Sequence, residues 1–251
     1  MPPEPLPYRD FYYPLNVFMH MLTREEGEVT YLHYGLFEHP DEPIAVAQER
    51  STELLLSRLP PPPARLLEVG MGLGTTLRRL ASMGYDAEGI TPDEKQVAIV
   101  RERHADALRV HCAAFETFAP GMTYDALVFQ ESSQYIEAET LFARAATLAP
   151  LVVVLDEFAL EPVEGLHRLD LFLEAAGSYG FSVAEEVDLS AQAAPTPRYF
   201  MERFARYRTE LMESLGLTSQ QVDDLVESGQ RYLERYRDGT YGYRLLRLVA
   251  G

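Results

Sequence analysis

Residues 66–74 read Leu-Leu-Glu-Val-Gly-Met-Gly-Leu-Gly, and this stretch decides the fold of the chain. An apolar run containing Glu68 is followed by glycines at three alternate positions, Gly70, Gly72 and Gly74, and then by a segment that favours a helix. Glycine lets the backbone turn tightly and lets a ligand approach the N–H groups at the start of a helix. The pattern therefore predicts a strand, a ligand-binding turn and a helix. A tight turn without a ligand is the alternative that this stretch alone leaves open.

The spacing of the glycines distinguishes two kinds of nucleotide-binding turn. A dinucleotide fingerprint follows G-x-G-x-x-G/A, which from Gly70 would place Thr75 in the third glycine slot. The spacing E-x-G-x-G-x-G from Glu68 to Gly74 instead resembles motif I of the class I S-adenosylmethionine (SAM)-dependent methyltransferases. The resemblance implies a Rossmann-like α/β fold whose cofactor SAM contacts Glu68, Gly70, Gly72 and Gly74.

From residue 65 onward, strands and helices alternate. Apolar runs predict strands at residues 65–69, 86–91, 108–112, 125–130, 151–156, 181–189 and 241–249. Helices are expected at residues 10–22, 42–59, 75–83, 92–104, 138–148, 165–176, 196–215 and 219–237. Unbroken apolar strands separated by helices indicate a parallel sheet that is covered on both faces. The predicted fold class is therefore α/β, with a mostly parallel seven-stranded sheet between helices.

The same pattern predicts the organisation of the chain. Residues 1–63 are expected to form an N-terminal helical cap segment, and residues 64–251 the methyltransferase core. Within the core, the helical insertion at residues 196–238 is expected to cover the substrate site. The alternative is that these late helices only extend the outer layer of the fold.

The end of the second predicted strand resembles one subgroup of this family. It reads Gly89-Ile-Thr-Pro-Asp-Glu-Lys-Gln96 and is similar to the pattern G-[IL]-T-x-x-x-x-Q of a subgroup that includes the cyclopropane fatty acid synthases. In that subgroup the Thr and the Gln hydrogen-bond the cofactor, so the resemblance implies this role for Thr91 and Gln96. A second interpretation, compatible with the first, is a helix capped by Thr91 with Pro92 at its first position.

Three further segments are compared with the same family. After the third strand the resemblance implies an adenine site, with Phe115 against the ring and Glu116 near its amino edge; a core role for Phe115 is the alternative. Residues 124–136 resemble motif IV of small-molecule methyltransferases, with Gln130 and Glu131 facing the site. The segment His33-Tyr34-Gly35 is similar to one that lies over the cofactor in small-molecule relatives, which include the sarcosine-type methyltransferases. This similarity adds Tyr34 to the cofactor residues.

A general base would assist some acceptors, and the candidates are His33, His167, Glu131 and Glu157. Histidine has an ordinary pKa of about 6.5, which suits a base at neutral pH. Cyclopropane synthases place a Glu and a Cys around a bicarbonate base, but here Gln134 and His33 stand at or near those positions. These departures favour methyl transfer to an N, O or C atom of a small-molecule acceptor. Another SAM-binding enzyme of this fold with non-methylating chemistry, or a non-catalytic SAM-binding protein, are the alternatives.

Charge and cysteine content limit the partners and the compartment. The 251 residues carry 39 acidic and 22 basic side chains, for a net charge of −17. Such a charge repels nucleic acids and anionic membrane surfaces, so neither is expected as a partner. A single cysteine allows no internal disulfide and no cysteine-based zinc cluster, so we expect no metal and a cytoplasmic location. The aromatic N-terminal segment could exchange between the subunits of a homodimer.

Overall fold

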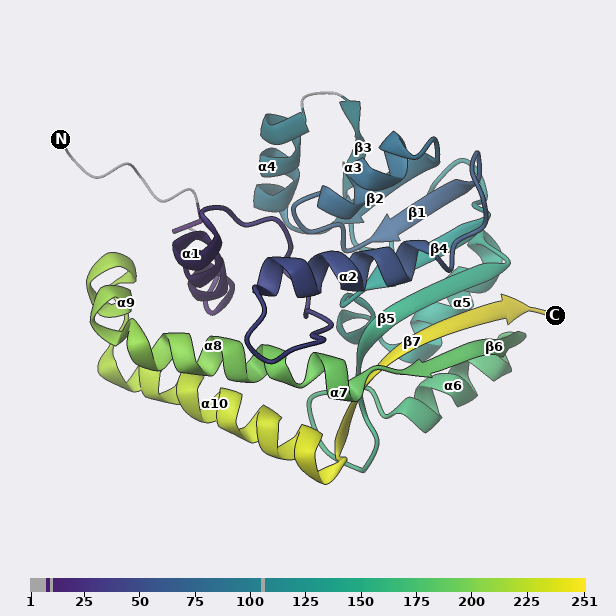
Figure 1. Ribbon diagram of the computed structural model, residues 1–251. Helices are drawn as coiled ribbons and strands as arrows, with labels where there is room; N and C mark the ends of the chain where they lie inside the picture. Colours follow the sequence, from purple (N-terminus) through teal and green to yellow (C-terminus); the bar gives the residue numbers. More distant parts are fainter. Residues whose placement is uncertain (1–7, 10, 105–106) are drawn as a thin grey trace.

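A seven-stranded sheet in the order β3-β2-β1-β4-β5-β7-β6 forms the centre of the protein (Figure 1). The computed structural model describes residues 8–9, 11–104 and 107–251. The strands are β1 (Arg65–Val69), β2 (Asp86–Thr91), β3 (Arg109–Cys112), β4 (Ala126–Gln130), β5 (Leu151–Ala159), β6 (Phe181–Asp188) and β7 (Tyr241–Ala250). β7 pairs antiparallel with both β5 and β6, and the other pairs are parallel. The predicted mostly parallel, Rossmann-like sheet is confirmed.

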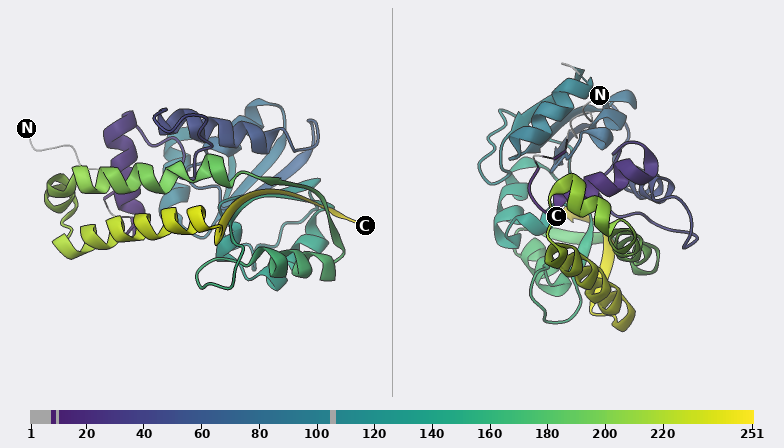
Figure 2. Two further views of the ribbon diagram at one scale, coloured as in Figure 1. Left: turned by 60° about the horizontal axis from the view of Figure 1, so that its bottom comes forward. Right: turned by 90° about the vertical axis from the view of Figure 1, so that its left-hand side faces the viewer.

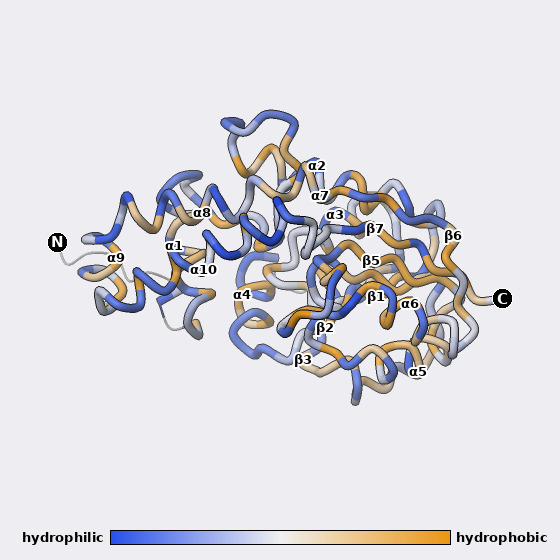
Figure 3. The backbone as a smooth tube through the Cα atoms, turned by 90° about the horizontal axis from the view of Figure 1, so that it is seen from below, coloured by the Kyte–Doolittle hydropathy of each residue, from blue (hydrophilic) through white to orange (hydrophobic). Residues whose placement is uncertain are grey.

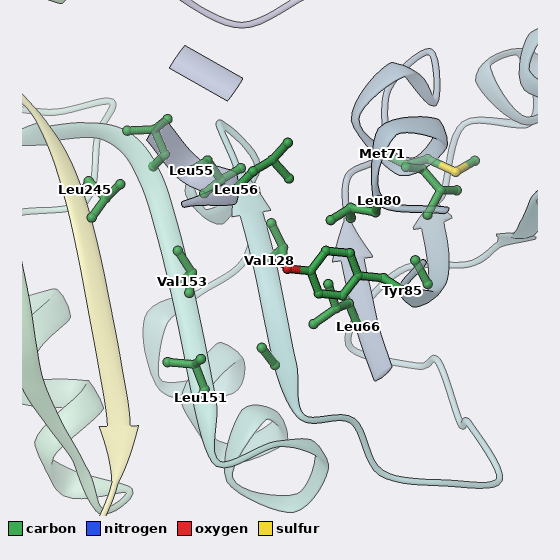
Figure 4. Packing of buried hydrophobic residues seen from close by; sticks show 14 of the residues in the cluster. Leu55, Leu56, Leu66, Met71, Leu80, Tyr85, Val128, Leu151, Val153 and Leu245 are labelled. Carbon is green, nitrogen blue, oxygen red and sulfur yellow. The ribbon is translucent and has the colours of Figure 1, made fainter. Parts of the chain in front are cut away.

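Helices cover both faces of the sheet, which explains its continuous apolar strands. One face carries α2 (Ile44–Leu56), α3 (Thr75–Ser82), α4 (Glu94–His104) and α7 (Ser190–Ala193), and the other carries α5 (Ala138–Leu148) and α6 (Leu169–Ser178). Every residue of β5 is buried, whereas the edge strand β6 exposes most of its side chains. Figure 4 shows the first of these faces, with side chains of α2 and α3 above Leu66, Val128, Val153 and Leu245 of four strands.

The sheet order creates the crevice in which a ligand would bind. β1 lies between β2 and β4, so the chain leaves β1 toward one edge of the sheet and returns through β4 toward the other. The connections after β1 and β4 therefore diverge at the carboxyl ends of these strands. In open α/β sheets this point of divergence is the usual ligand-binding crevice.

A second lobe stands beside the sheet and combines an early helix of the chain with three late ones. It consists of α1 (Leu15–Glu26), α8 (Pro195–Arg206), α9 (Arg208–Leu215) and α10 (Ser219–Asp238), which lie together in both views of Figure 2. Val17 and Met21 of α1 share one buried cluster with Phe200, Phe204 and residues of α9 and α10. Figure 3 shows hydrophobic residues concentrated along the strands, whereas the helices of this lobe are more hydrophilic. No described helix is long and apolar enough to cross a membrane.

Three helices differ most from their predicted bounds. The helix expected at 10–22 begins at Leu15, after Pro14, and Asp10 lies outside the described residues. The helix expected at 165–176 begins at Leu169, because the two preceding residues pair with the end of β5. Arg168 forms a β-bridge with Ala159, and the His167 carbonyl accepts from the Ala159 N–H. The helix expected at 196–215 is divided at Tyr207, whose backbone leaves the helical region at φ −99° and ψ 21°. Burial of Leu211 in the lobe accompanies this change of direction.

Candidate active site

The turn after β1 is fixed to the neighbouring strand by its backbone. The N–H groups of Gly70 and Met71 donate to the Ile90 carbonyl of β2 at 2.9 and 3.1 Å. Gly70, Gly72 and Gly74 have φ values of 75°, 53° and 75°. Side chains disfavour this left-handed region, so the conformation of the turn requires glycine.

The three glycines have different surroundings. A Cβ atom at Gly70 would overlap Ser132 after β4, and one at Gly74 would lie 2.9 Å from Val100 of α4. A Cβ atom at Gly72 would meet only one leucine side chain, at 3.7 Å. Gly72 therefore borders open space, whereas Gly74 permits close packing between α3 and α4.

The open space is a cavity of about 420 Å³ at the carboxyl ends of β1, β2 and β4. Most predicted site residues line it, namely His33, Glu68, Gly70, Gly72, Thr91, Gln96, Phe115, Glu116, Gln130 and Glu131. Three predicted residues, Tyr34, Gly74 and Glu157, do not line it. Segments far apart in the sequence thus meet at the point that the sheet order indicates.

Glu68 supplies a buried acceptor to this cavity. Its side chain is 3% exposed, and its Oε2 atom has no hydrogen-bond partner among the described residues. Burial raises the pKa of this carboxyl to about 8. A buried polar group without a partner is costly, so a ligand with a positive charge or a hydrogen-bond donor would stabilise this wall of the cavity.

Thr91 and Gln96 contact each other at the end of β2. The Thr91 hydroxyl donates to Gln96 Oε1 at 2.8 Å, and both residues line the cavity. The alternative that Thr91 caps the following helix is wrong, because Asp93 takes this position. The helix begins at Glu94, and the carboxylate of Asp93 accepts from the N–H groups of Lys95 and Gln96.

Phe115 and Glu116 follow β3 in the chain, and both line the cavity. Phe115 is 2% exposed and packs edge-to-face on Phe129 with ring centroids 5.5 Å apart. It therefore belongs to the core and also lines the cavity, and its contact with adenine stays a prediction. Glu116 also lines the cavity and is exposed.

His33 is part of a chain of hydrogen bonds and is neutral. The Tyr34 carbonyl can only accept, so His33 Nδ1 donates to it at 2.9 Å and Nε2 accepts from the Thr52 hydroxyl at 3.0 Å. Gln130 Nε2 donates to the same hydroxyl oxygen, and Gln130 Oε1 accepts from Thr76. Burial lowers the pKa of His33 to about 4. With both nitrogens engaged, His33 would receive a proton only through Thr52.

Glu131 connects the cavity to two other parts of the chain. Its backbone has φ 52°, the only positive value at a described residue other than glycine. Its Oε1 atom accepts from the Tyr34 N–H and from the Tyr243 hydroxyl, each at 2.6 Å. Burial, followed by the nearby acids Asp156 and Glu157, holds the pKa of this carboxyl well above its usual range, although the Tyr243 bond opposes the shift.

Tyr34 and Glu157 lie behind the cavity wall. The Tyr34 ring is stacked on Tyr243 with centroids 5.9 Å apart. Glu157 Oε1 accepts from the hydroxyl of Tyr236 on α10 at 2.6 Å, and burial raises the pKa of Glu157 to about 7. These residues support Glu131 and the segment before Gly35, and in this structure they are separated from the cavity.

The sequence interpretation did not single out several residues of the site. Thr52 and Thr76 complete the hydrogen bonds of Gln130, and the ring of Tyr135 borders the cavity with an exposed fraction of 81%. Of these residues, only Thr76 could have been found from a local pattern, because it closely follows the glycine turn in the sequence. Among the described residues, no group of three His, Cys, Asp or Glu side chains is arranged to hold a metal ion.

Comparison with known proteins gives one family match and many structural matches. Residues 67–149 match the family model of the methyltransferase domain. No curated protein matches the sequence significantly.

Three solved structures illustrate the structural similarity. The cyclopropane synthase MmaA2 from Mycobacterium tuberculosis is 18% identical, with 97% of this chain and 96% of that chain covered and a TM-score of 0.80. The [4+2]-cyclase SpnF is 22% identical, with 92% of each chain covered and a TM-score of 0.77. Geranyl diphosphate C-methyltransferase from Streptomyces coelicolor A3(2), solved with Mg²⁺, geranyl diphosphate and S-adenosyl-L-homocysteine, is 16% identical, with 98% and 99% covered and a TM-score of 0.68. Residues 67–149 thus match a methyltransferase domain, and the chain as a whole shares the fold of these solved structures.

Proposed function

We propose that the protein transfers a methyl group from SAM to an N, O or C atom of a small-molecule acceptor. One observation carries the proposal: a single cavity joins the strand-end residues expected to hold the cofactor to Glu131 and to the exposed rings of Tyr12 and Tyr135. A cofactor and an acceptor could therefore meet in one cavity. Binding side by side aligns reactants, and alignment can contribute several kcal/mol to lowering the barrier.

The chemistry of the cavity wall fits SAM. The unpartnered Glu68 oxygen suits the cationic amino group, the Thr91–Gln96 pair suits ribose hydroxyls, and Phe115 with Glu116 suits adenine. Gly70 and Gly72 keep side chains out of the path of the ligand. Bound SAM supplies an activated methyl group on a sulfonium.

The remaining predicted residues have supporting roles in this proposal. Gly74 keeps α3 close to α4, and Tyr34 donates its N–H to Glu131. We assign the proton-accepting role to Glu131, because it lines the cavity and its pKa is raised. Glu157 stands behind it, and His33 orders the segment that carries Tyr34.

Partners and location form a further part of the proposal. The net charge of −17 supports a small-molecule acceptor over nucleic acid or an anionic membrane. The free thiol of Cys112 is compatible with a cytoplasmic location. Exchange of the N-terminal segment in a homodimer stays a prediction, as does catalysis without a metal. Likewise, the insertion at 196–238 is proposed to cover the acceptor, and its packing against α1 supports this.

Non-methylating chemistry is the second candidate function, and the similarity to the [4+2]-cyclase SpnF favours it. The two functions differ in the fate of the methyl group. With SAM that carries a deuterated methyl group, a methyltransferase forms a labelled product and consumes SAM. A cyclase-like enzyme forms an unlabelled product and leaves SAM intact.

Calorimetry tests the cofactor assignment directly. We expect SAM and S-adenosylhomocysteine to bind with micromolar affinity and NADH not to bind. Gly72→Val places a side chain at the cavity wall and should weaken SAM binding at least about tenfold. Gly121→Val is the matched control, because Gly121 is exposed and a Cβ atom there meets nothing within 4 Å. Unchanged affinity in Gly72→Val, or no binding of either ligand to the wild type, would overturn the proposal.

A further inference from the structure

Carboxyl groups line the cavity without a basic counterpart among the described residues. Glu68, Asp93, Glu116 and Glu131 line it, and no Lys or Arg stands among the described lining residues. His33, the one histidine of the wall, is neutral because burial lowers its pKa to about 4. A phosphate or carboxylate on the acceptor would therefore find no basic side chain in the cavity and would face acids.

A second layer of acids lies directly behind Glu131. Asp156 accepts from the N–H and hydroxyl of Ser133, and Glu157 accepts from Tyr236, so the groups that bond both carboxyls are neutral. Burial raises the pKa of Asp156 to about 6 and that of Glu157 to about 7. The titratable groups packed around this layer are Tyr34, Tyr135, His167, Tyr232, Tyr236 and Tyr243. Buried acids without a cationic partner favour a ligand that brings a positive charge.

Aromatic rings occupy the outer part of the same cavity. Tyr12 from the N-terminal segment and Tyr135 from the short helix Ser133–Tyr135 both line it and are among the most exposed large side chains of the described chain. Leu15 and Ile136 add apolar surface beside them. The face of an aromatic ring attracts organic cations and also packs on apolar groups.

We propose that the acceptor is an organic amine that enters as its cation, with the ammonium group at Glu131 and the apolar part between Tyr12 and Tyr135. This inference rests on the proposed function and specifies its substrate class. The positive charge of the bound ammonium group ionises Glu131, whose proton leaves to solvent. One ammonium proton then passes to the Glu131 carboxylate, and the nitrogen uses the freed lone pair to bond the methyl carbon. The electrons of the broken carbon–sulfur bond remain on sulfur, and the proton leaves Glu131 to solvent.

Binding to the complex with S-adenosylhomocysteine tests the inference without measuring turnover. The probes are two matched series for calorimetry: phenethylamine, phenylethanol and phenylacetate, and hexylamine, hexanol and hexanoate. We expect at least one amine to bind roughly tenfold more tightly than its alcohol, and the carboxylates not to bind. A carboxylate that binds as tightly as its amine, or no binding by either amine, overturns the proposal.

Variants show whether Glu131 and Tyr135 cause the preference. Glu131→Gln keeps an oxygen for the Tyr34 N–H and should remove the preference for amine over alcohol, while S-adenosylhomocysteine affinity is retained. Glu174→Gln, on the exposed side of α6, is the control for the loss of one negative charge. Tyr135→Ala, at an exposed position that does not endanger folding, should weaken amine binding, and Tyr135→Phe should restore it. An unchanged amine preference in both Glu131→Gln and Tyr135→Ala contradicts the inference.

The same titrations separate the two proposals. Failure of the wild type to bind S-adenosylhomocysteine refutes the proposed function. Binding of S-adenosylhomocysteine without any preference for amines refutes only the substrate class.

Discussion

Replacement of Glu68 by Gln is expected to stabilise the ligand-free protein at neutral pH and to weaken SAM binding. The carboxyl is buried at the end of β1, and one of its oxygens has no partner among the described residues. Its pKa rises from 4.5 to about 8, and burial is the cause. Glutamine has nearly the same shape and does not ionise, so the variant removes the charge and leaves the packing.

The pH dependence follows from the two pKa values. Below pH 4.5 the carboxyl is protonated in both the folded and the unfolded chain and has no effect. Between pH 4.5 and about 8 the unfolded chain loses the proton while the folded chain keeps it, so stability falls as the pH rises. The full loss above this range is about 5 kcal/mol, and the loss at neutral pH is about 3 kcal/mol.

Urea unfolding followed by circular dichroism measures this effect at several values between about pH 5 and pH 8 without SAM. The quantity of interest is the difference in unfolding free energy between Glu68→Gln and the wild type. Other buried acids, such as Asp156 and Glu157, titrate in both proteins and cancel in this difference. The difference should grow in favour of the variant as the pH rises. Glu174→Gln should show no such trend, because Glu174 is exposed.

A difference that does not vary with pH would refute the reasoning, since Glu68 would then titrate alike in both states. SAM binding provides the second measurement. Hydrogen bonds to an ionised carboxylate are stronger than those to a neutral amide, so the variant should bind SAM at least about tenfold more weakly. Equal SAM affinity would show that Glu68 does not contact the cofactor.

Three further variants test separate parts of the site. Gly70→Ala should lower the unfolding free energy by at least about 2 kcal/mol, because alanine is strained in the left-handed backbone region and its Cβ atom overlaps Ser132. Adding Ser132→Gly should partly restore the stability measured by urea unfolding. No recovery would exclude the contact with Ser132 as the cause. His33→Ala should reduce turnover more than SAM affinity, and an equal loss in kinetics and calorimetry would make His33 a cofactor or packing residue. Tyr236→Phe removes the donor to Glu157 and should cost about 1–3 kcal/mol in thermal or urea unfolding; unchanged stability would mean that water replaces the hydroxyl.

Much of the fold could be predicted because its signals are local. The bounds of β1 and β2 match their predictions, since a turn follows each of these short strands directly. The helix expected at 165–176 begins late because residues 167 and 168 pair with the end of β5, and no local pattern contains that contact. The two-part nature of the cap was missed for the same reason: α1 and α8 are far apart in the sequence and share one core.

The sequence by itself determined the strand–turn–helix at Glu68 to Gly74 and the methyltransferase resemblance, because alternate glycines have few conformational substitutes. Only the tertiary structure decided which predicted residues share the cavity. It placed Gly74 in a packing contact and Glu157 behind the wall, and it engaged both nitrogens of His33. The physical reason is that pKa values, hydrogen-bond partners and cavity walls depend on contacts between distant segments, such as that of Glu131 with residues of the N-terminal segment and of β7.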